Sequence, residues 1–258
     1  MRHFSEVDST NGQLKVEAKA GNVPEGTVFT TDFQTNGRGR LDRRWESPPG
    51  QGLLFSLLLF PELPPDQLPL ISLMGSMAVL DGILKFMEEY PIRCDALQAI
   101  ELKWPNDLIV DGRKICGILS ETGLDNQRRR FFILGIGLNV NQTSDDFPEP
   151  LQDTAVSLRM IVGFDLLRDH LLRYILKELE ECYNRLKVEG SDWIAPLWLE
   201  RSRYEERSVT VMNHKRKITG IVVGLESNGA LKLRISGDPA KVETIYSGDV
   251  TSRCSQDQ

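Results

Sequence analysis

The 258-residue sequence has few of the residues that form metal or redox centres. It contains three histidines and four cysteines, all scattered, and no pair of cysteines has CxxC spacing. A structural zinc site or a redox dithiol therefore has little support. The first residues of the chain also lack the apolar core of a secretory signal. Free thiols in a reducing, cytoplasmic compartment are the simplest interpretation.

Long apolar runs and net positive charge are missing as well. The most apolar stretch, 68–87, is interrupted by Pro69, Asp81 and Lys85, so we expect no membrane-spanning helix. The formal net charge is -6, from 31 basic and 37 acidic residues. An acidic total argues against a protein whose main partner is nucleic acid, although it leaves room for a local basic patch.

The residues that are present indicate a globular protein with a sizeable core. Apolar residues make up 40% of the chain and charged residues 26%, and a chain of this length folds without disulfides or metals. Thr10 followed by Gln13 fits a capping box, which predicts a helix over 11–20. Alternating β-branched and aromatic residues predict a strand over 27–34, and the apolar run at 53–60 predicts a strand buried on both faces.

The middle of the chain combines helical and strand patterns. A buried helix is predicted over 67–89, and a long amphipathic helix over 165–188, with Leu166 and Leu167 on its apolar face. Asp111-Gly112 is a strong signal for a two-residue hairpin turn between the second and third strands of an antiparallel meander. The four strands of this meander are predicted near 100–104, 107–110, 113–121 and 131–140.

The C-terminal part returns to short strands separated by turn signals. This pattern, over 207–250, is typical of a small β-barrel. We place a domain boundary near residue 204, which divides the chain into residues 1–204 and 205–258.

A loop rich in glycine and arginine is the first feature that suggests chemistry. It runs from Gln34 to Trp45 and contains four arginines, at positions 38, 40, 43 and 44. Glycines allow close approach of the backbone to a ligand, and arginine forks suit carboxylate and phosphate groups. The loop therefore predicts a phosphate or nucleotide site. A solvated, flexible loop and an RGG-like nucleic-acid tract are the alternatives.

Two further clusters follow in the predicted meander. The Asp111-Gly112 turn would bring Asp107 close to Lys114, and a carboxylate beside a cation is suited to Mg²⁺ and to charge stabilisation at phosphate. A surface ion pair on a hairpin is the alternative. The segment 135–141 has a GxG pattern but lacks the third glycine of a dinucleotide fingerprint, so a Rossmann site is weakly supported.

Taken together, these motifs resemble those of biotin protein ligases. GRGR, KWPND and GxGxN are each weak signals, but their combination, in the order and spacing of the family, is specific. The resemblance covers about residues 5–142. The matching residues are Ser9-Thr10-Asn11, Gln34, Gly37-Arg38-Gly39-Arg40, Arg43, Trp45, Lys103-Trp104-Pro105-Asn106-Asp107, Lys114, Gly117, Gly135 and Asn139-Val140.

The resemblance implies a fold and an activity. The expected fold is α+β, with a mixed or antiparallel sheet, helices packed on it and a small C-terminal SH3-like β-barrel. The implied activity is ATP-dependent biotinylation of one lysine on the biotin carboxyl carrier domain of a carboxylase, through biotinyl-AMP. Biotin, ATP and Mg²⁺ are the implied ligands.

The resemblance also assigns roles to individual residues. It makes Lys114 the chief catalytic residue, together with Arg40 and Arg38, and it places Asp107 at the metal ion. At biotin it places Ser9, Thr10, Gln34, Gly37, Arg38, Arg40, Lys114, Gly117 and Gly135. At ATP it places Arg40, Arg43, Trp45, Asn106 and Asn139.

The sequence departs from the family pattern in two ways. Asp42 stands where the family usually has the third glycine of the loop, and a carboxylate there is expected to weaken ATP binding or to hold Arg43 or Arg44. The motif that begins at Ser9 lies close to the first residue, so we expect no DNA-reading module and no operator binding. The sequence leaves open whether the protein is a monomer or a homodimer.

Two rival functions remain at this point. Lipoate or octanoate ligases and transferases resemble biotin ligases in fold, and the GRGR and KWPND motifs favour biotin over these substrates. A non-catalytic regulator that only binds biotin is the second rival. The retained Lys114, Asp107 and arginines of the loop argue against it.

Overall fold

The computed structural model describes residues 1–41, 43–90, 95–213 and 216–252. Its largest unit is a seven-stranded sheet of order β1-β2-β3-β7-β6-β5-β4. The strands are β1 (Arg2–Val7), β2 (Val28–Gln34), β3 (Gly52–Leu59), β4 (Ile100–Lys103), β5 (Asp107–Val110), β6 (Arg113–Leu124) and β7 (Arg130–Asn139). β1 and β2 pair in parallel and the other neighbours are antiparallel, so the expected mixed α+β architecture is confirmed.

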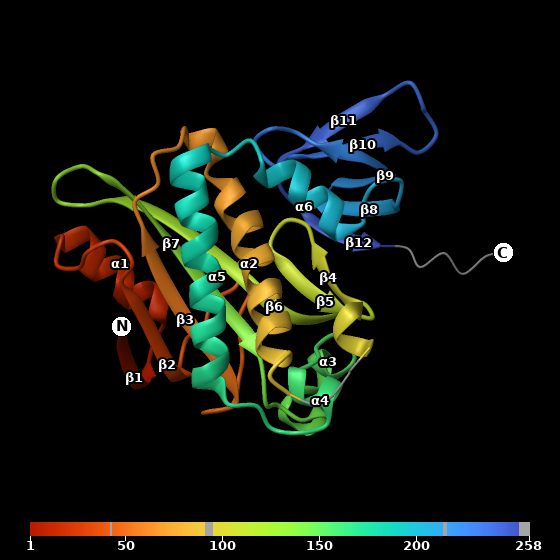
Figure 1. Cartoon of the computed structure of the whole chain (residues 1–258). Helices are drawn as coiled ribbons and strands as arrows, with labels where there is room; N and C mark the ends of the chain where they lie inside the picture. The colour runs from red at the N-terminus through yellow and green to blue at the C-terminus, as the bar shows by residue number, and fades with distance from the viewer. Residues whose placement is uncertain (42, 91–94, 214–215, 253–258) are drawn as a thin grey trace.

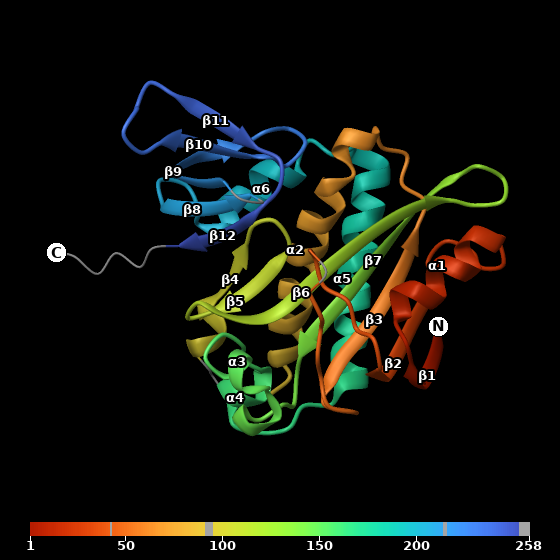
Figure 2. The ribbon, with the colours of Figure 1, turned by 180° about the vertical axis from the view of Figure 1, so that it is seen from behind.

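Helices cover this sheet unequally on its two faces. α2 (Pro69–Met87) and α5 (Arg168–Glu189) pack side by side over one face (Figure 1). α1 (Thr10–Ala20) and the loop after β2 lie on the other face (Figure 2). The stretch Pro65–Met87 is long and apolar enough to cross a membrane, but 78% of its most apolar window is buried within the fold. α2 therefore serves as the core helix.

The central strand β3 has apolar side chains on both faces of the large sheet, so both faces must be covered. All eight of its residues are buried, as predicted. Phe55 and Leu57 belong to the large core beneath α2 and α5, and Leu58 belongs to a smaller core beneath α1. Since successive side chains of a strand point to opposite faces, Ser56 faces α1 together with Leu58.

Two local predictions are wrong. Ser9, and not Thr10, is the N-cap of α1, because the Ser9 side chain accepts a hydrogen bond from the Gly12 N–H. Leu167 is 60% exposed, because it is the N-cap residue of α5 and precedes the buried stripe that begins at Leu171. β1 was not predicted, since its exposed and polar residues give no alternating pattern.

The predicted meander is confirmed in β4, β5, β6 and β7. Asp111 and Gly112 both have positive φ, 50° and 76°, as a two-residue turn of this hairpin requires. β6 contains a bulge, because Leu108 pairs with Cys116 while Ile109 pairs with Lys114, which leaves Ile115 as an extra residue.

The C-terminal residues form a separate antiparallel sheet of order β11-β10-β9-β8-β12, consistent with the expected SH3-like unit. Trp104 connects it to the large sheet, since its Nε1–H donates to the Gly229 carbonyl at 2.9 Å. The strands are β8 (Ser208–Asn213), β9 (Arg216–Leu225), β10 (Leu231–Ile235), β11 (Val242–Ile245) and β12 (Asp249–Ser252). The remaining helices are α3 (Glu149–Gln152), α4 (Leu158–Val162) and α6 (Ile194–Ser202), with short 3-10 turns at Pro65–Gln67, Asp95–Ala99 and Ser144–Asp146.

Candidate active site

A cavity of about 390 Å³ lies between the large sheet, α1, the Gly/Arg loop and the start of β12. This volume lies within the usual range for ligand pockets. Most of the residues predicted from the sequence line it, namely Ser9, Thr10, Gln34, Arg38, Arg40, Arg43, Trp45, Asn106, Asp107, Lys114, Gly117, Gly135 and Asn139. Gly37 instead lines a smaller neighbouring cavity, and its carbonyl accepts a hydrogen bond from the Trp45 N–H.

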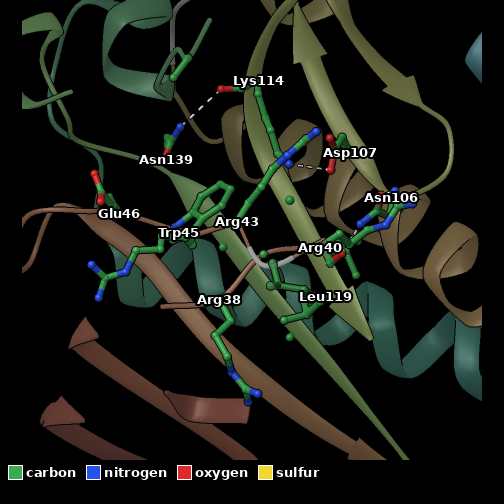
Figure 3. A pocket seen from close by; sticks show the side chains of 18 of the residues that line it. Arg38, Arg40, Arg43, Trp45, Glu46, Asn106, Asp107, Lys114, Leu119 and Asn139 are labelled. Carbon is green, nitrogen blue, oxygen red and sulfur yellow. Dashed lines mark hydrogen bonds and ion pairs between the residues drawn. The ribbon is translucent and has the colours of Figure 1, made fainter. Parts of the chain in front are cut away.

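The β-bulge in β6 aims Lys114 into the cavity. In a regular strand, Lys114 and Gly117 would point to opposite faces because they are three residues apart. The bulge takes up Ile115 as an extra residue and brings both to the same face. The Lys114 backbone bonds to the segment after α3, with its N–H 2.7 Å from the Thr154 carbonyl. Its Nζ lies 2.8 Å from Asp107 Oδ1. A dashed line in Figure 3 marks this contact. The expected pairing of Asp107 with Lys114 is therefore present.

Arg40 contacts polar groups beside both sheets, and Arg43 pairs with the C-terminal sheet. Arg40 donates to Asn106 Oδ1 at 2.9 Å and to the Gly248 carbonyl at 3.2 Å. Arg43 forms an ion pair with Asp249, and Arg40 lies 3.8 Å from the same carboxylate. Asp249 belongs to β12, far along the chain, and no motif in the sequence points to it. The C-terminal sheet thus supplies an acidic group to the site.

Arg38 lies apart from the other cations of the loop. In Figure 3 its side chain points away from Lys114, and its guanidinium donates to Glu121 at 3.0 Å. Glu121 also accepts a hydrogen bond from Lys15 at 2.8 Å. Burial disfavours the charged carboxylate, but the Lys15 hydrogen bond and the Arg38 charge outweigh it and lower the pKa of Glu121. Sequence reasoning missed Glu121.

Trp45 lies directly over two strands of the sheet. A Cβ atom at Gly137 would come within 2.6 Å of the Trp45 ring, and one at Gly117 within 2.9 Å. Lys114 Nζ is 5.6 Å from the ring centroid, which is the range of a cation–π contact. The indole Nε1–H is buried and has no hydrogen-bond partner among the described residues. The two glycines therefore provide the space that Trp45 occupies.

Asn139 and Asn106, both predicted at the nucleotide, contact the backbone of the site. The Asn139 amide donates to the Val156 carbonyl at 3.1 Å, which ties β7 to the segment beside Lys114. The Asn106 amide donates to the Ile118 carbonyl and leaves its oxygen for Arg40. Both side chains are nearly fully buried. Asn139 positions the segment beside Lys114, and Asn106 positions Arg40. The motifs alone do not reveal these contacts.

Lys103 is a further cation of the cavity without a role assigned from the sequence. It is part of the KWPND motif and lines the site at the end of β4. Burial disfavours its charged form and lowers its pKa below the ordinary value, with the charge of Lys114 acting in the same direction.

The residues present fit a metal ion that arrives with a nucleotide. Among the described residues, no three His, Cys, Asp or Glu side chains form a group that could hold a metal ion by themselves. Asp107 offers one carboxylate in the cavity, and Mg²⁺ commonly uses one or two carboxylates together with phosphate oxygens. The predicted site at Asp107 thus requires oxygens from a bound nucleotide.

Comparison with known proteins identifies the family. The Biotin/lipoate A/B protein ligase family matches residues 4–141, and the Biotin protein ligase C terminal domain matches residues 206–251. The chain belongs to the biotin/lipoate A/B protein ligase family. A bifunctional ligase/repressor BirA from Bacillus spizizenii is 33% identical over 249 residues, which cover 96% of this chain and 72% of that protein.

Other members of this family agree in sequence and structure. The biotin--[acetyl-CoA-carboxylase] ligase of Mycobacterium tuberculosis is 28% identical over 95% of this chain and 86% of its own length. A biotin protein ligase from Aquifex aeolicus, solved in complex with biotin and ATP, superposes with a TM-score of 0.77. It is 32% identical, and the match covers 97% of each chain.

Proposed function

We propose that this chain is a biotin protein ligase that uses ATP to attach biotin to one lysine of a biotin carboxyl carrier domain. The observation that carries the proposal is the composition of one cavity. Its lining combines the cations Lys114, Arg40 and Arg43 with the uncharged polar groups of Thr10 and Gln34. An anionic reaction centre beside a ring with hydrogen-bonding groups fits this arrangement.

In the first step, a carboxylate oxygen of biotin attacks the α-phosphorus of ATP. The new bond is C–O–P, and the bond to the bridging oxygen breaks, so pyrophosphate leaves with that electron pair. Two anions must meet, which makes cations at the reacting oxygens the main requirement. Lys114 would sit between the biotin carboxylate and the α-phosphate, with Arg40 as a further donor. Arg38 would join them only on leaving Glu121. Arg43 would reach the triphosphate.

In the second step, the uncharged amine of the carrier lysine attacks the acyl carbon of biotinyl-AMP. AMP leaves with the electron pair of the C–O bond, and the amine gives up one proton as the amide forms. The mixed anhydride is sensitive to water, so a closed site is needed. Trp45 and the loop that carries it lie over the cavity and would exclude water there.

Asp107 would hold Mg²⁺ together with phosphate oxygens when the nucleotide is bound. The ion would supply charge neutralisation at the phosphates. Lys114 pairs with Asp107 in the structure, and a metal ion held by Asp107 would leave Lys114 available for the carboxylate and phosphate oxygens.

The test is incubation of the protein with biotin, ATP, Mg²⁺ and a biotin carboxyl carrier domain, followed by mass spectrometry of the carrier. We expect a gain of one biotinyl group, and no gain on a carrier whose target lysine is replaced by arginine. A parallel reaction with lipoate or octanoate in place of biotin distinguishes the rival acyl substrates. Modification of the carrier by lipoate but not by biotin would contradict the proposal.

Three further predictions belong to this function. We expect a cytoplasmic enzyme, no binding to operator DNA, and a monomer or a homodimer in solution. Fractionation of the source cells, an electrophoretic mobility shift with operator DNA and light scattering test them in turn. The division of the chain near residue 204 also stays a prediction, and it falls between α6 and β8.

A further inference from the structure

The main chain of Lys114 is held by the segment that follows α3. The pairing of β6 with β7 ends at Cys116, and residues 154–156 take the next place beside β6. The Lys114 N–H donates to the Thr154 carbonyl at 2.7 Å, and the Lys114 carbonyl accepts from the Val156 N–H at 3.0 Å. The position of this lysine in the cavity therefore depends on how firmly residues 154–156 are fixed.

Asn139 joins this segment to Lys114 from the end of β7. Its side-chain amide donates to the Val156 carbonyl at 3.1 Å and to the Lys114 carbonyl at 3.4 Å (Figure 3). Carbonyl oxygens only accept hydrogen bonds, so the NH₂ group of Asn139 must face them and its oxygen must face away. That oxygen accepts a hydrogen bond from Gln142 Nε2 at 3.3 Å. Gln142 thus completes the orientation of Asn139.

Gln142 holds the segment with its side chain and with its main chain. Its Nε2 also donates to the Ser47 hydroxyl at 3.0 Å, which uses the second hydrogen of the amide. Its main-chain carbonyl accepts from the Ser157 hydroxyl at 2.6 Å, and Ser157 is also the N-cap of α4. Both Gln142 and Ser157 are 0% exposed. Gln142 therefore fixes Asn139 on one side and the end of the segment on the other.

We propose that Gln142 and Ser157 are positioning residues for Lys114, which act through residues 154–156. The lysine ammonium must lie between two reacting oxygens, and a shift of about 1 Å in such a group can lower a rate about 100-fold. Both residues lie outside the motifs that the sequence offers. This inference rests on the proposed function, which makes Lys114 the chief catalytic residue.

The first test is a double-mutant cycle on biotin-dependent pyrophosphate release. Gln142→Met removes the amide donors together with Gln142 Oε1, a buried atom that has no hydrogen-bond partner among the described residues. We expect kcat to fall about tenfold while the KM values of biotin and ATP stay within about twofold, because the lysine acts in the transition state. In the Lys114→Ala background the same change should lower kcat less than about twofold, since its effect passes through Lys114. A high enzyme concentration keeps the slow reaction of Lys114→Ala measurable.

Two further variants separate positioning from packing and from the Gly/Arg loop. Gln152→Met is the matched control, because that amide donates to the Phe147 carbonyl at 3.1 Å and lies outside the cavity. Its kcat should equal that of the wild type. Ser47→Ala removes only the contact of Gln142 with the chain that follows the loop, and it leaves the bond to Asn139 in place. Its kcat should stay within about twofold of the wild type.

Ser157→Ala and amide hydrogen exchange give two independent measurements. Ser157→Ala should also lower kcat, with no further effect in the Lys114→Ala background, and it carries the cycle if Gln142→Met does not fold. In both single variants the backbone amide of Lys114 should exchange with deuterium faster than in the wild type, because its bond to Thr154 opens more often. Exchange followed by NMR needs no turnover. Thermal unfolding of each variant verifies that it is folded.

Specific outcomes would overturn the proposal. It fails if folded Gln142→Met has the kcat of the wild type, if its effect multiplies with that of Lys114→Ala, or if Ser47→Ala causes an equal loss. Unchanged exchange at the Lys114 amide also refutes it. A wild type that biotinylates the carrier while Gln142→Met is neutral refutes only the positioning role. A wild type that does not biotinylate the carrier, while Gln142→Met still speeds exchange at Lys114, refutes the proposed function and leaves the support of the lysine main chain established.

Discussion

Replacing Asp249 by asparagine should tighten the binding of ATP to the free protein. In the structure, Asp249 pairs with Arg43 and lies 3.8 Å from Arg40. Both arginines are expected to bind the phosphates of ATP. The Asp249 carboxylate, which belongs to the C-terminal sheet, thus competes with the nucleotide for the same two arginines. Asparagine keeps the size and a neutral acceptor while it removes the competing charge.

The structure sets the size of this effect. Arg43 is 66% exposed and the Asp249 side chain 29% exposed, so each pair contributes only about 0.2–1 kcal/mol. A negative charge about 6 Å from a phosphate in surroundings close to water adds about 0.7 kcal/mol of repulsion. Together these contributions amount to roughly 1–3 kcal/mol, which corresponds to about 5- to 100-fold in Kd. The high exposure of Arg43 favours the lower end of this range.

Calorimetry with a non-hydrolysable ATP analogue and Mg²⁺, in the absence of biotin, measures the change directly. Asp238→Asn is the matched control, because Asp238 is an exposed acid in the loop between β10 and β11 and does not line the cavity. The Kd of biotin should be the same in all three proteins. An unchanged or weaker ATP affinity for Asp249→Asn, or an equal gain for Asp238→Asn, would refute the competition.

Three other predictions concern the chemistry, the domain contact and the pH dependence. Lys114→Ala should slow biotin-dependent pyrophosphate release about 10²- to 10³-fold, because the carboxylate and phosphate oxygens lose a cation in the transition state, and normal release would exclude this role. Trp104→Phe removes the hydrogen bond to Gly229 and should lower the free energy of unfolding by about 1 kcal/mol in urea titrations. Trp193→Phe is its control, since that indole N–H has no partner among the described residues, and an equal loss in both variants would count against the domain contact. Glu121 has a pKa below its ordinary value of 4.5, so its contribution to stability is present above pH 4.5 and is lost as the pH falls through the lowered pKa. The stability difference between wild type and Glu121→Gln should therefore shrink in acid, and a difference that grows below pH 4.5 would contradict this.

The elements with strong local patterns were predictable from the sequence. The run at 53–60 became β3, Asp111-Gly112 became the expected hairpin, and the amphipathic stripe became α5. The effect of Asp42 stays a prediction, because this residue lies outside the described part of the chain. The helix cap at Ser9 was misplaced by one residue, because neighbouring hydroxyls have similar capping propensity and their tertiary partners decide which one caps.

The sequence by itself determined the family and most of the cavity lining, because GRGR, KWPND and GxGxN are local motifs read from neighbouring residues. Only the tertiary structure decided which side chains act together. The bulge at Ile115 turns Lys114 into the cavity, and Asp249 reaches the arginines from another sheet. Hydrogen bonds among Thr10, Asn11, Ser56 and Glu121 join three segments of the chain. Such contacts depend on strand register and on the packing of distant elements, and no local pattern encodes either.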